Sequence, residues 1–256
     1  MLKLFEMHTD PRFYPLLNGI VLLEEAKATC VQLLPATQLT DPYFIGRQLG
    51  FFARQRGWQQ QDISAVASMW SKSYLSLFTG GWLIARVLLD KEIVAHPARL
   101  LLAHNEAGLV TSVVVPNQGK NAAPVSSVND FTPLFRQHIT PHFTSLSEVA
   151  GVNVAVLWSN VASGVDTLFR LLSASGQLSP EKQEAMSRLF TEKYWPDGER
   201  NLLYRPVFTR KSPTGETIRL RKGCCLRYLL PEMGYCKNCC LPQAWQANFP
   251  TATTDS

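Results

Sequence analysis

The chain has 256 residues, of which 46% are hydrophobic and 18% are charged, and its formal net charge is +5. A disordered chain would have fewer apolar residues and a higher net charge, so that class is excluded, as is collagen-like or low-complexity material. The length suits one large domain, or one domain with a small appendage. A charged fraction below the roughly 25% of typical soluble domains indicates either a large buried fraction or an unusually apolar surface.

No signal for export or membrane insertion is predicted. Residues 1–10 include one lysine but no sustained apolar run and no small-residue cleavage site. The most apolar stretch, residues 66–89, carries Lys72 and Arg86, which argues against a membrane span. We therefore expect a cytoplasmic protein, with peripheral contact at the cytoplasmic face of the inner membrane left open. In that reducing compartment, cysteines stay free or bind metal.

The first half of the chain shows two helical patterns. Residues 20–34 have helical spacing and contain Cys30, for which a small buried side chain is expected. Asp62 is predicted to cap a long helix, which the pair Gly80–Gly81 should end before a second helix begins. Aromatic residues recur every four positions on this segment, and such a stripe favours core packing over a cofactor platform. They are Trp70, Tyr74, Phe78 and Trp82.

Short β-favouring runs follow. Two apolar runs within residues 99–115 flank a glycine-containing turn and predict a hairpin, and residues 116–128 are expected to form a loop. Residues 131–143 predict a short helix that closes near Pro141. His138 and His142 lie four apart, but the intervening proline and the lack of a nearby acidic ligand argue against a metal site there.

The second half alternates helices with a hairpin. Residues 147–174 predict one helix, whose apolar face excludes Asn160 and Asp166. Ser179 should cap another helix, and a turn is expected at residues 195–198. Strands at 202–208 and 216–220 flank a hairpin signal. The fold class predicted is α+β, with a helix-rich domain at residues 1–200, an antiparallel sheet, and a small C-terminal segment at residues 201–256. No Gly-rich phosphate loop follows a βαβ pattern, so no nucleotide site is predicted.

Five of the six cysteines fall within 17 residues. Cys224 and Cys225 are followed, ten residues later, by the Cys236-x-x-Cys239 knuckle and by Cys240. A Cys-x-x-Cys turn presents two thiolates to one metal, whereas adjacent cysteines diverge and suit a single small ion poorly. Four thiolates are the usual shell of a [2Fe–2S] cluster, which spreads its ligands over two irons. A Cys₄ zinc site and disulfides or redox thiols are the alternatives.

This Cys-Cys-x₁₀-Cys-x₂-Cys pattern near the end of the chain resembles that of the ferric siderophore reductases of the FhuF type. The resemblance implies that Cys224, Cys225, Cys236 and Cys239 hold a [2Fe–2S] cluster, with Cys240 as a competing neighbour. It also implies that the preceding part shares its domain with the C-terminal region of siderophore synthetases.

The segment around the cysteines is strongly basic. Residues 205–227 contain seven Lys and Arg and only one acid, Glu216. Cations near a cluster stabilise its more negative reduced form and should raise its potential. A solvated basic face, or a nucleic-acid or membrane patch, is the alternative, and the few aromatics nearby disfavour nucleic acid.

The function implied is one-electron reduction of a ferric siderophore, with the hydroxamate type expected, and release of Fe(II). An external donor, such as a flavoprotein, ferredoxin or flavodoxin, would supply the electron, because no NAD or flavin site is recognisable. Aromatic residues such as Trp70, Trp82 or Trp158 are candidates to line a siderophore pocket. The alternatives are a zinc-stabilised binding module and a siderophore-assembly protein with a structural metal.

Overall fold

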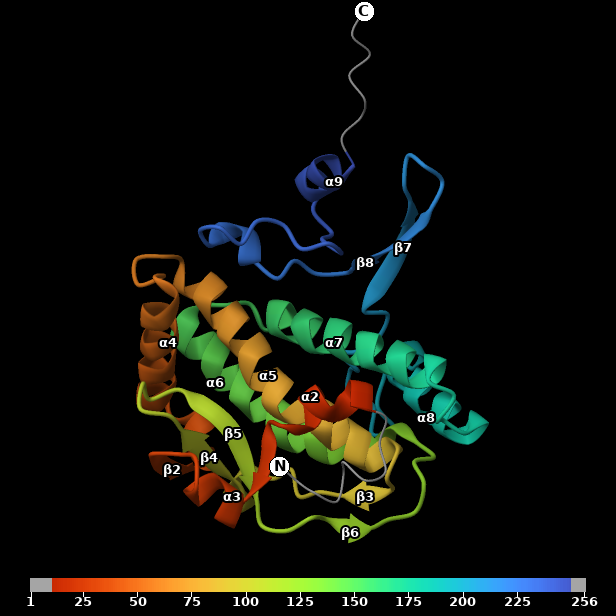
Figure 1. Cartoon of the computed structure of the whole chain (residues 1–256). Coiled ribbons are helices and arrows are strands. Elements are labelled where there is room, and N and C mark those ends of the chain that lie inside the picture. The colour runs from red at the N-terminus through yellow and green to blue at the C-terminus, as the bar shows by residue number, and fades with distance from the viewer. Residues whose placement is uncertain (1–10, 250–256) are drawn as a thin grey trace, which may run out of the picture.

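The computed structural model describes residues 11–249. The prediction that no signal peptide is present concerns residues 1–10, which lie outside that range. The helices are α2 (Tyr14–Leu17), α3 (Leu23–Lys27), α4 (Pro42–Arg56), α5 (Ile63–Val87), α6 (Thr140–Ala150), α7 (Val154–Ala174), α8 (Pro180–Thr191) and α9 (Pro242–Asn248). The strands are β1 (Ile20–Leu22), β2 (Gln32–Pro35), β3 (Lys91–Glu92), β4 (Leu101–His104), β5 (Val110–Val115), β6 (Lys120–Asn121), β7 (Val207–Lys211) and β8 (Thr217–Arg221). Figure 1 shows α5 at the centre of the helical body, with α7 beside it and the four-stranded sheet at one end.

The predicted α+β class is confirmed. The largest sheet has the strand order β1-β5-β4-β2, and two-stranded sheets join β3 to β6 and β7 to β8. The predicted hairpin of residues 99–115 is the antiparallel pair β4–β5. The four-stranded sheet is mixed and not purely antiparallel as predicted, because β1 runs parallel to β5.

Helix α5 is longer than predicted. Asp62 caps it as expected, since its carboxylate accepts hydrogen bonds from the backbone N–H groups of Ser64 and Ala65. The prediction that Gly80–Gly81 ends the helix is wrong. These glycines instead let α2 approach closely, because a Cβ on Gly81 would lie 2.9 Å from the Leu16 carbonyl oxygen. The predicted aromatic stripe of α5 is buried in the core.

Residues 20–34 do not form the predicted helix. They divide into β1, the short helix α3 and β2. Ile20 pairs with Val113 in the sheet, so β-pairing prevails over the helical spacing of the apolar residues. Cys30 is only half-buried, and it packs against a small apolar cluster beneath this sheet.

The helices around residue 140 also differ from prediction. Pro133–Ile139 is a π-helix that continues into α6. Pro141 lies in the first turn of α6, where the N–H that proline lacks is not needed for a hydrogen bond within the helix. The single helix predicted for residues 147–174 is two helices. Gly151, with φ of 63°, ends α6, and Asn153 caps α7 by accepting from the N–H of Ala155.

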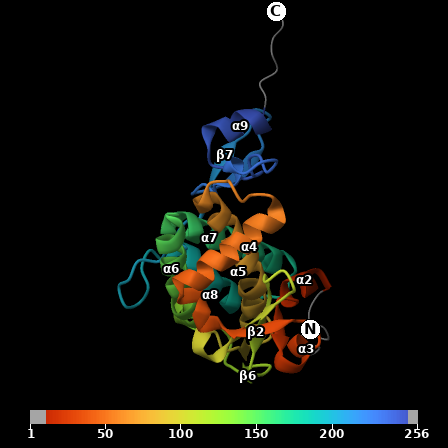
Figure 2. The same ribbon diagram turned by 90° about the vertical axis from the view of Figure 1, so that its left-hand side faces the viewer.

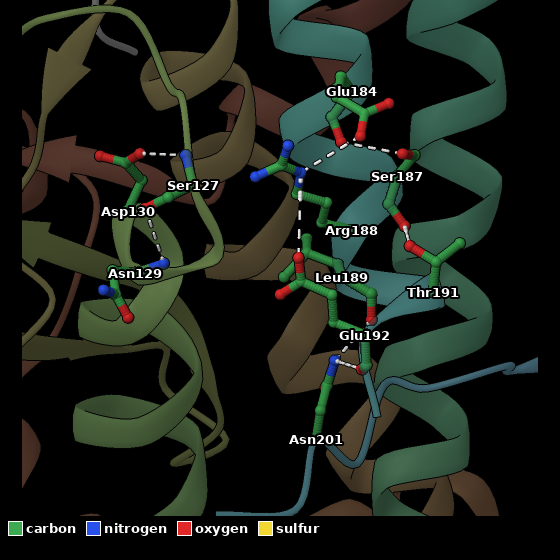
Figure 3. A network of polar contacts seen from close by, with 10 residues as sticks. All are labelled: Ser127, Asn129, Asp130, Glu184, Ser187, Arg188, Leu189, Thr191, Glu192 and Asn201. Carbon is green, nitrogen blue, oxygen red and sulfur yellow. Dashed lines mark hydrogen bonds and ion pairs between the residues drawn. The ribbon is translucent and has the colours of Figure 1, made fainter. Parts of the chain in front are cut away.

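Helix α8 anchors the chain that leads to the cysteines. Ser179 caps it as predicted, and Arg188 pairs with Glu184 and Glu192 along one face. Figure 3 shows these pairs and the Asn201 side chain, whose Nδ2 donates to the carbonyl oxygens of Leu189 (2.9 Å) and Glu192 (2.8 Å). Asn201 therefore satisfies carbonyls at the C-terminal end of α8 and fixes the segment that follows it.

The C-terminal segment lies over one end of the helical body. Both views place residues 222–241 above the ends of α5 and α7, with α9 farther out (Figures 1 and 2). The predicted hairpin is confirmed as β7–β8, although its first strand begins at Val207. Arg210 of β7 stacks over the Trp245 ring of α9 at 4.1 Å. Within residues 11–249, no helix combines the length and the apolar character that a bilayer span needs.

Candidate metal centre

The two halves of the cysteine motif meet at the end of β8. The backbone N–H of Arg221 donates to the carbonyl oxygen of Asn238 at 2.9 Å, which places the second half beside the first. The Cys236–Cys239 knuckle is a tight turn, closed by a 3.0 Å hydrogen bond from the N–H of Cys239 to the carbonyl oxygen of Cys236. The fold thus brings together segments that are ten residues apart in the sequence.

The sulfur atoms of Cys225 and Cys236 lie 3.9 Å apart. This is far longer than a disulfide bond, and all six cysteines are free. Two thiolates on one tetrahedral metal, each roughly 2.3 Å from it, are about 3.8 Å apart. Within residues 11–249, no three His, Cys, Asp or Glu side chains converge around a single point that could hold one ion. Because a two-iron cluster takes two thiolates at each iron, the Cys225–Cys236 pair fits one of them.

The cysteines differ in burial. Cys225, Cys236 and Cys239 are buried, whereas Cys224 and Cys240 are partly exposed. The Sγ of Cys224 accepts a 3.3 Å hydrogen bond from the backbone N–H of Leu226, a residue in the left-handed conformation with φ of 60°. The motif therefore has a buried side, on the helical body, and a side that faces outward at Cys224.

The buried thiols of Cys225 and Cys236 share one hydrogen bond, and this bond is the largest influence on the pKa of each. It lowers the pKa of Cys225 to about 5, with a further contribution from the Arg221 charge. The same hydrogen bond, together with burial, raises the pKa of Cys236. Burial also raises the pKa of Cys224. One thiolate next to one thiol is therefore favoured at neutral pH, and metal binding would displace the remaining proton.

Arg221 is a buried cation, with 2% of its surface exposed. Its guanidinium donates to Asn160 Oδ1 at 2.7 Å and to Ser159 Oγ at 3.1 Å, both on α7. No carboxylate of the described residues forms an ion pair with it. A buried charge normally needs an anionic partner. The thiolates are the anions available, and the charge of Arg221 acts on the pKa of Cys225.

Two residues of α5 complete this buried side. Ser68 Oγ donates to the carbonyl oxygen of Cys225 at 2.8 Å, and Asn160 Nδ2 donates to Ser68 Oγ at 3.0 Å. Burial lowers the pKa of Lys72, and the charges of Cys225 and Cys236 oppose that effect. Chains of hydrogen bonds from α5 and α7 therefore hold the cysteine loop on the helical body.

Asn160 and Asp166 were predicted to lie outside the apolar face of α7, yet both are buried. Asn160 is buried against Ser68 of α5, and both Asn160 and Asp166 meet an arginine side chain of β8. Arg219 pairs with Asp166 at 2.7 Å, two residues along the strand from the contact between Arg221 and Asn160. The sequence shows these polar residues, but it does not show that the C-terminal segment supplies their partners.

The predicted basic residues and the three candidate tryptophans differ in their surroundings. Of the basic stretch, Lys222 is exposed, and Arg227 donates through Nε to the carbonyl oxygen of Met233 at 2.8 Å. Among the three candidate tryptophans, Trp82 is a core residue whose indole N–H donates to the Ile93 carbonyl oxygen. Trp70 lines a cavity on the far side of α5, and Trp158 lines one beside the cysteine loop.

His138 and His142 are both buried, but only His138 has hydrogen-bond partners for its ring nitrogens among the described residues. His138 is hydrogen-bonded through its two ring nitrogens to Tyr74 Oη and to the Ala95 carbonyl oxygen, each at 2.8 Å. His142 stacks against Tyr74, with ring centroids 4.8 Å apart, and against Trp70. Both imidazoles therefore belong to the aromatic core of α5 and α6.

Comparison with known proteins decides the family. The family model described as "Ferric iron reductase FhuF-like transporter" matches residues 68–214, more than half of the chain. The model described as "FhuF 2Fe-2S C-terminal domain" matches residues 221–241, which contain the cysteine motif. The chain belongs to the FhuF family. Its cofactor is the [2Fe–2S] cluster of that C-terminal domain, so the zinc alternative is set aside.

One curated relative is the "Ferric siderophore reductase" of Escherichia coli (strain K12), which is 27% identical over 178 residues. The match covers 69% of this chain and 65% of the relative, just under two thirds of the relative's length.

Among solved structures, the aerobactin synthetase IucA of Klebsiella pneumoniae is similar in fold. In its ATP-bound form the TM-score is 0.51, the identity 12%, and the match covers 67% of this chain and 36% of the synthetase. A second structure of that synthetase gives a TM-score of 0.50 at 12% identity, covering 73% of this chain and 36% of the synthetase. At this identity the likeness concerns the fold alone. The expected likeness of the helical part to siderophore synthetases is met in fold.

Proposed function

We propose that the protein reduces ferric siderophores by one electron and thereby releases Fe(II). The observation that carries this proposal is the cysteine motif in the residues that match the [2Fe–2S] domain, held against a large helical body. A [2Fe–2S] cluster supplies single electrons, the amount that converts Fe(III) to Fe(II). The name of the curated relative supports the same activity.

In this proposal Cys224, Cys225, Cys236 and Cys239 are the four ligands. The 3.9 Å spacing of the Cys225 and Cys236 sulfurs supports them as a pair on one iron. Cys239 is preferred to Cys240 because it belongs to the knuckle turn and is buried with the pair. The division into residues 1–200, which bind the substrate, and residues 201–256, which carry the cluster, is part of the same proposal.

The residues around the motif have separate tasks. Ser68 and Asn160 hold the loop, and the cations Arg221 and Lys72 offset its negative charge. Cys224 faces outward, so electrons are expected to enter and leave on its side. Hydroxamate oxygens are hard anionic donors that hold Fe(III) far more tightly than Fe(II), which makes one electron sufficient for release. The substrate is therefore proposed to be a ferric hydroxamate.

The electron donor is proposed to be a separate flavoprotein, ferredoxin or flavodoxin. None of the six cysteines forms a disulfide, which supports a cytoplasmic location, where such donors occur and thiols stay reduced.

The test is anaerobic stopped-flow mixing of chemically reduced protein with ferrioxamine B or ferrichrome. We expect the visible absorption of the oxidised cluster to return while a ferrous chelator captures Fe(II). A cluster that stays reduced for minutes with both complexes present would contradict a reductase.

A further inference from the structure

A cavity of about 270 Å³ adjoins the start of the cysteine loop. One wall is α7, with Trp158 and Ser159, and the other is the segment of residues 200–206. Lys222 and Gly223, the two residues before Cys224, close the third side. A molecule in this cavity would therefore contact the two residues that directly precede the partly exposed Cys224.

The walls of this cavity are fixed by hydrogen bonds. Asn201 ties the 200–206 segment to α8 through the two carbonyl contacts shown in Figure 3, and its Oδ1 accepts from the N–H of Leu203 at 2.9 Å. On the opposite wall, Ser159 Oγ donates to the Gly223 carbonyl oxygen at 2.9 Å. The cavity is thus preformed, as small-molecule sites usually are.

The mouth of the cavity is positive. Arg200 and Lys222 are exposed at it, and no Asp or Glu is among the residues that line it. The nearest acids in the sequence, Asp197 and Glu199, form ion pairs with Arg136 instead. Neither Arg200 nor Lys222 forms an ion pair with any residue in the range 11–249, so both charges are free for a ligand.

The remaining lining adds apolar and aromatic surface. Trp158 is buried at the wall, Tyr204 is half-buried, and Ala155 and Ala162 lie alongside on α7. The volume is near the lower end for small-molecule sites, so it suits one face of a chelate better than a whole large ligand. A protein partner would need a flat area of roughly 800 Å² and gains little from a narrow recess.

We propose that this cavity binds one face of the ferric complex, and that Arg200 and Lys222 select complexes with negative charge on their periphery. This inference rests on the proposed reductase function, since it places the substrate beside the cluster. The iron in the complex would then face Cys224, while carboxylate or other anionic oxygens contact the two cations. Exposed ion pairs are individually weak, so the selection is a matter of several-fold and not of all or none.

The test measures binding without electron transfer. The oxidised holoprotein is dialysed to equilibrium against Ga(III) complexes of desferrioxamine B, of its N-acetyl derivative and of its N-succinyl derivative. These share one metal core, but they carry one positive charge, none and one negative charge, respectively, and gallium is not reduced. We expect the affinity to rise along this series by about tenfold in low salt and the rise to shrink in high salt.

The variant Arg200→Gln/Lys222→Gln should bind all three complexes alike. Arg99→Gln/Lys120→Gln, which removes two exposed cations outside the cavity, should keep the rise. Equal affinities in the unmodified protein, or a rise that survives in the first variant, would overturn the proposal. Stopped-flow reduction of ferrioxamine B by the same proteins separates the two ideas. If the protein transfers electrons but shows no charge selection, the cavity proposal fails and the reductase proposal stands. If it selects by charge but transfers no electrons, the reductase proposal fails and the binding role of the cavity stands.

Discussion

Replacing Arg221 by glutamine is expected to lower the midpoint potential of the cluster far more than replacing its neighbour Lys222. Reduction adds one negative charge, so a nearby cation stabilises the reduced form more than the oxidised form. Arg221 is buried against α7, whereas Lys222 is exposed. The two variants remove the same formal charge one residue apart, and only the surroundings differ.

The magnitude follows from Coulomb's law. For a charge roughly 7 Å away, the interaction is about 2.4 kcal/mol at an effective dielectric constant of 20, which suits a buried site, and about 0.6 kcal/mol at the value of water. For a one-electron couple, 59 mV corresponds to about 1.4 kcal/mol. Arg221→Gln should therefore lower the potential by about 100 mV, and Lys222→Gln by about 25 mV.

The assay is an anaerobic redox titration followed by visible absorption. Arg221→Lys serves as the conservative variant, because it keeps the charge while losing the two-pronged contact with Ser159 and Asn160. It should recover most of the potential, which a purely structural role of the guanidinium would not explain. Equal shifts in the glutamine variants of Arg221 and Lys222, or no shift in either, would refute the assignment of Arg221 as the buried partner of the cluster.

Three further outcomes are expected. Cys239→Ser should lose or distort the visible absorption of the purified protein, and Cys240→Ser should keep it; the reverse result would reassign the fourth ligand. Gly223→Ala should destabilise the protein by about 1–3 kcal/mol in urea titrations, since the new Cβ would lie 2.9 Å from a Ser159 oxygen, whereas Gly164→Ala on α7 meets nothing within 4 Å and should not destabilise. Burial lowers the pKa of His142 to about 3, so this group stays neutral in the fold but gains a proton in the unfolded chain below its ordinary pKa. The free energy of unfolding should therefore fall by about 1.6 kcal/mol from this group between pH 6.5 and 5, and His142→Phe should reduce that slope; an unchanged slope would contradict it.

Local signals in the sequence predicted much of the fold. The caps at Asp62 and Ser179, the β4–β5 hairpin and the turn before Arg200 all depend on neighbouring residues, and all are confirmed. The errors arise where distant parts of the chain decide. Gly81 is a helix breaker by propensity, yet in α5 it provides the space that α2 occupies. Residues 20–34 have a helical pattern, but Ile20 finds a partner strand 93 positions away in the sequence.

Only the cysteines of the candidate site could be predicted from the sequence. The cysteine spacing identifies the family, because the motif lies within a single short segment. The residues that hold it do not form a motif. Ser68, Lys72 and Asn160 come from two helices far from the cysteines in the sequence, and nothing in their neighbourhood marks them. A weak signal was present in Asn160, a polar residue close to the apolar side of a strongly amphipathic helix.

The geometry of β8 and α7 explains why two arginines of the basic stretch contact α7 while the neighbouring lysine is exposed. Side chains alternate along a strand, so Arg219 and Arg221 project to one side of β8, while Lys222 follows the last residue of the strand. Residues seven apart lie on the same face of a helix, and Ser159 and Asp166 have this spacing on α7. The two arginines therefore meet the two polar positions, Arg219 at Asp166 and Arg221 at Ser159. We expect the buried charge of Arg221 to act strongly on the cluster, and the exposed charge of Lys222 to remain available to a ligand in solution. If both proposals hold, the tuning of the cluster and the selection of the substrate rest on different residues, and neutralising Lys222 should change selection while shifting the potential only slightly.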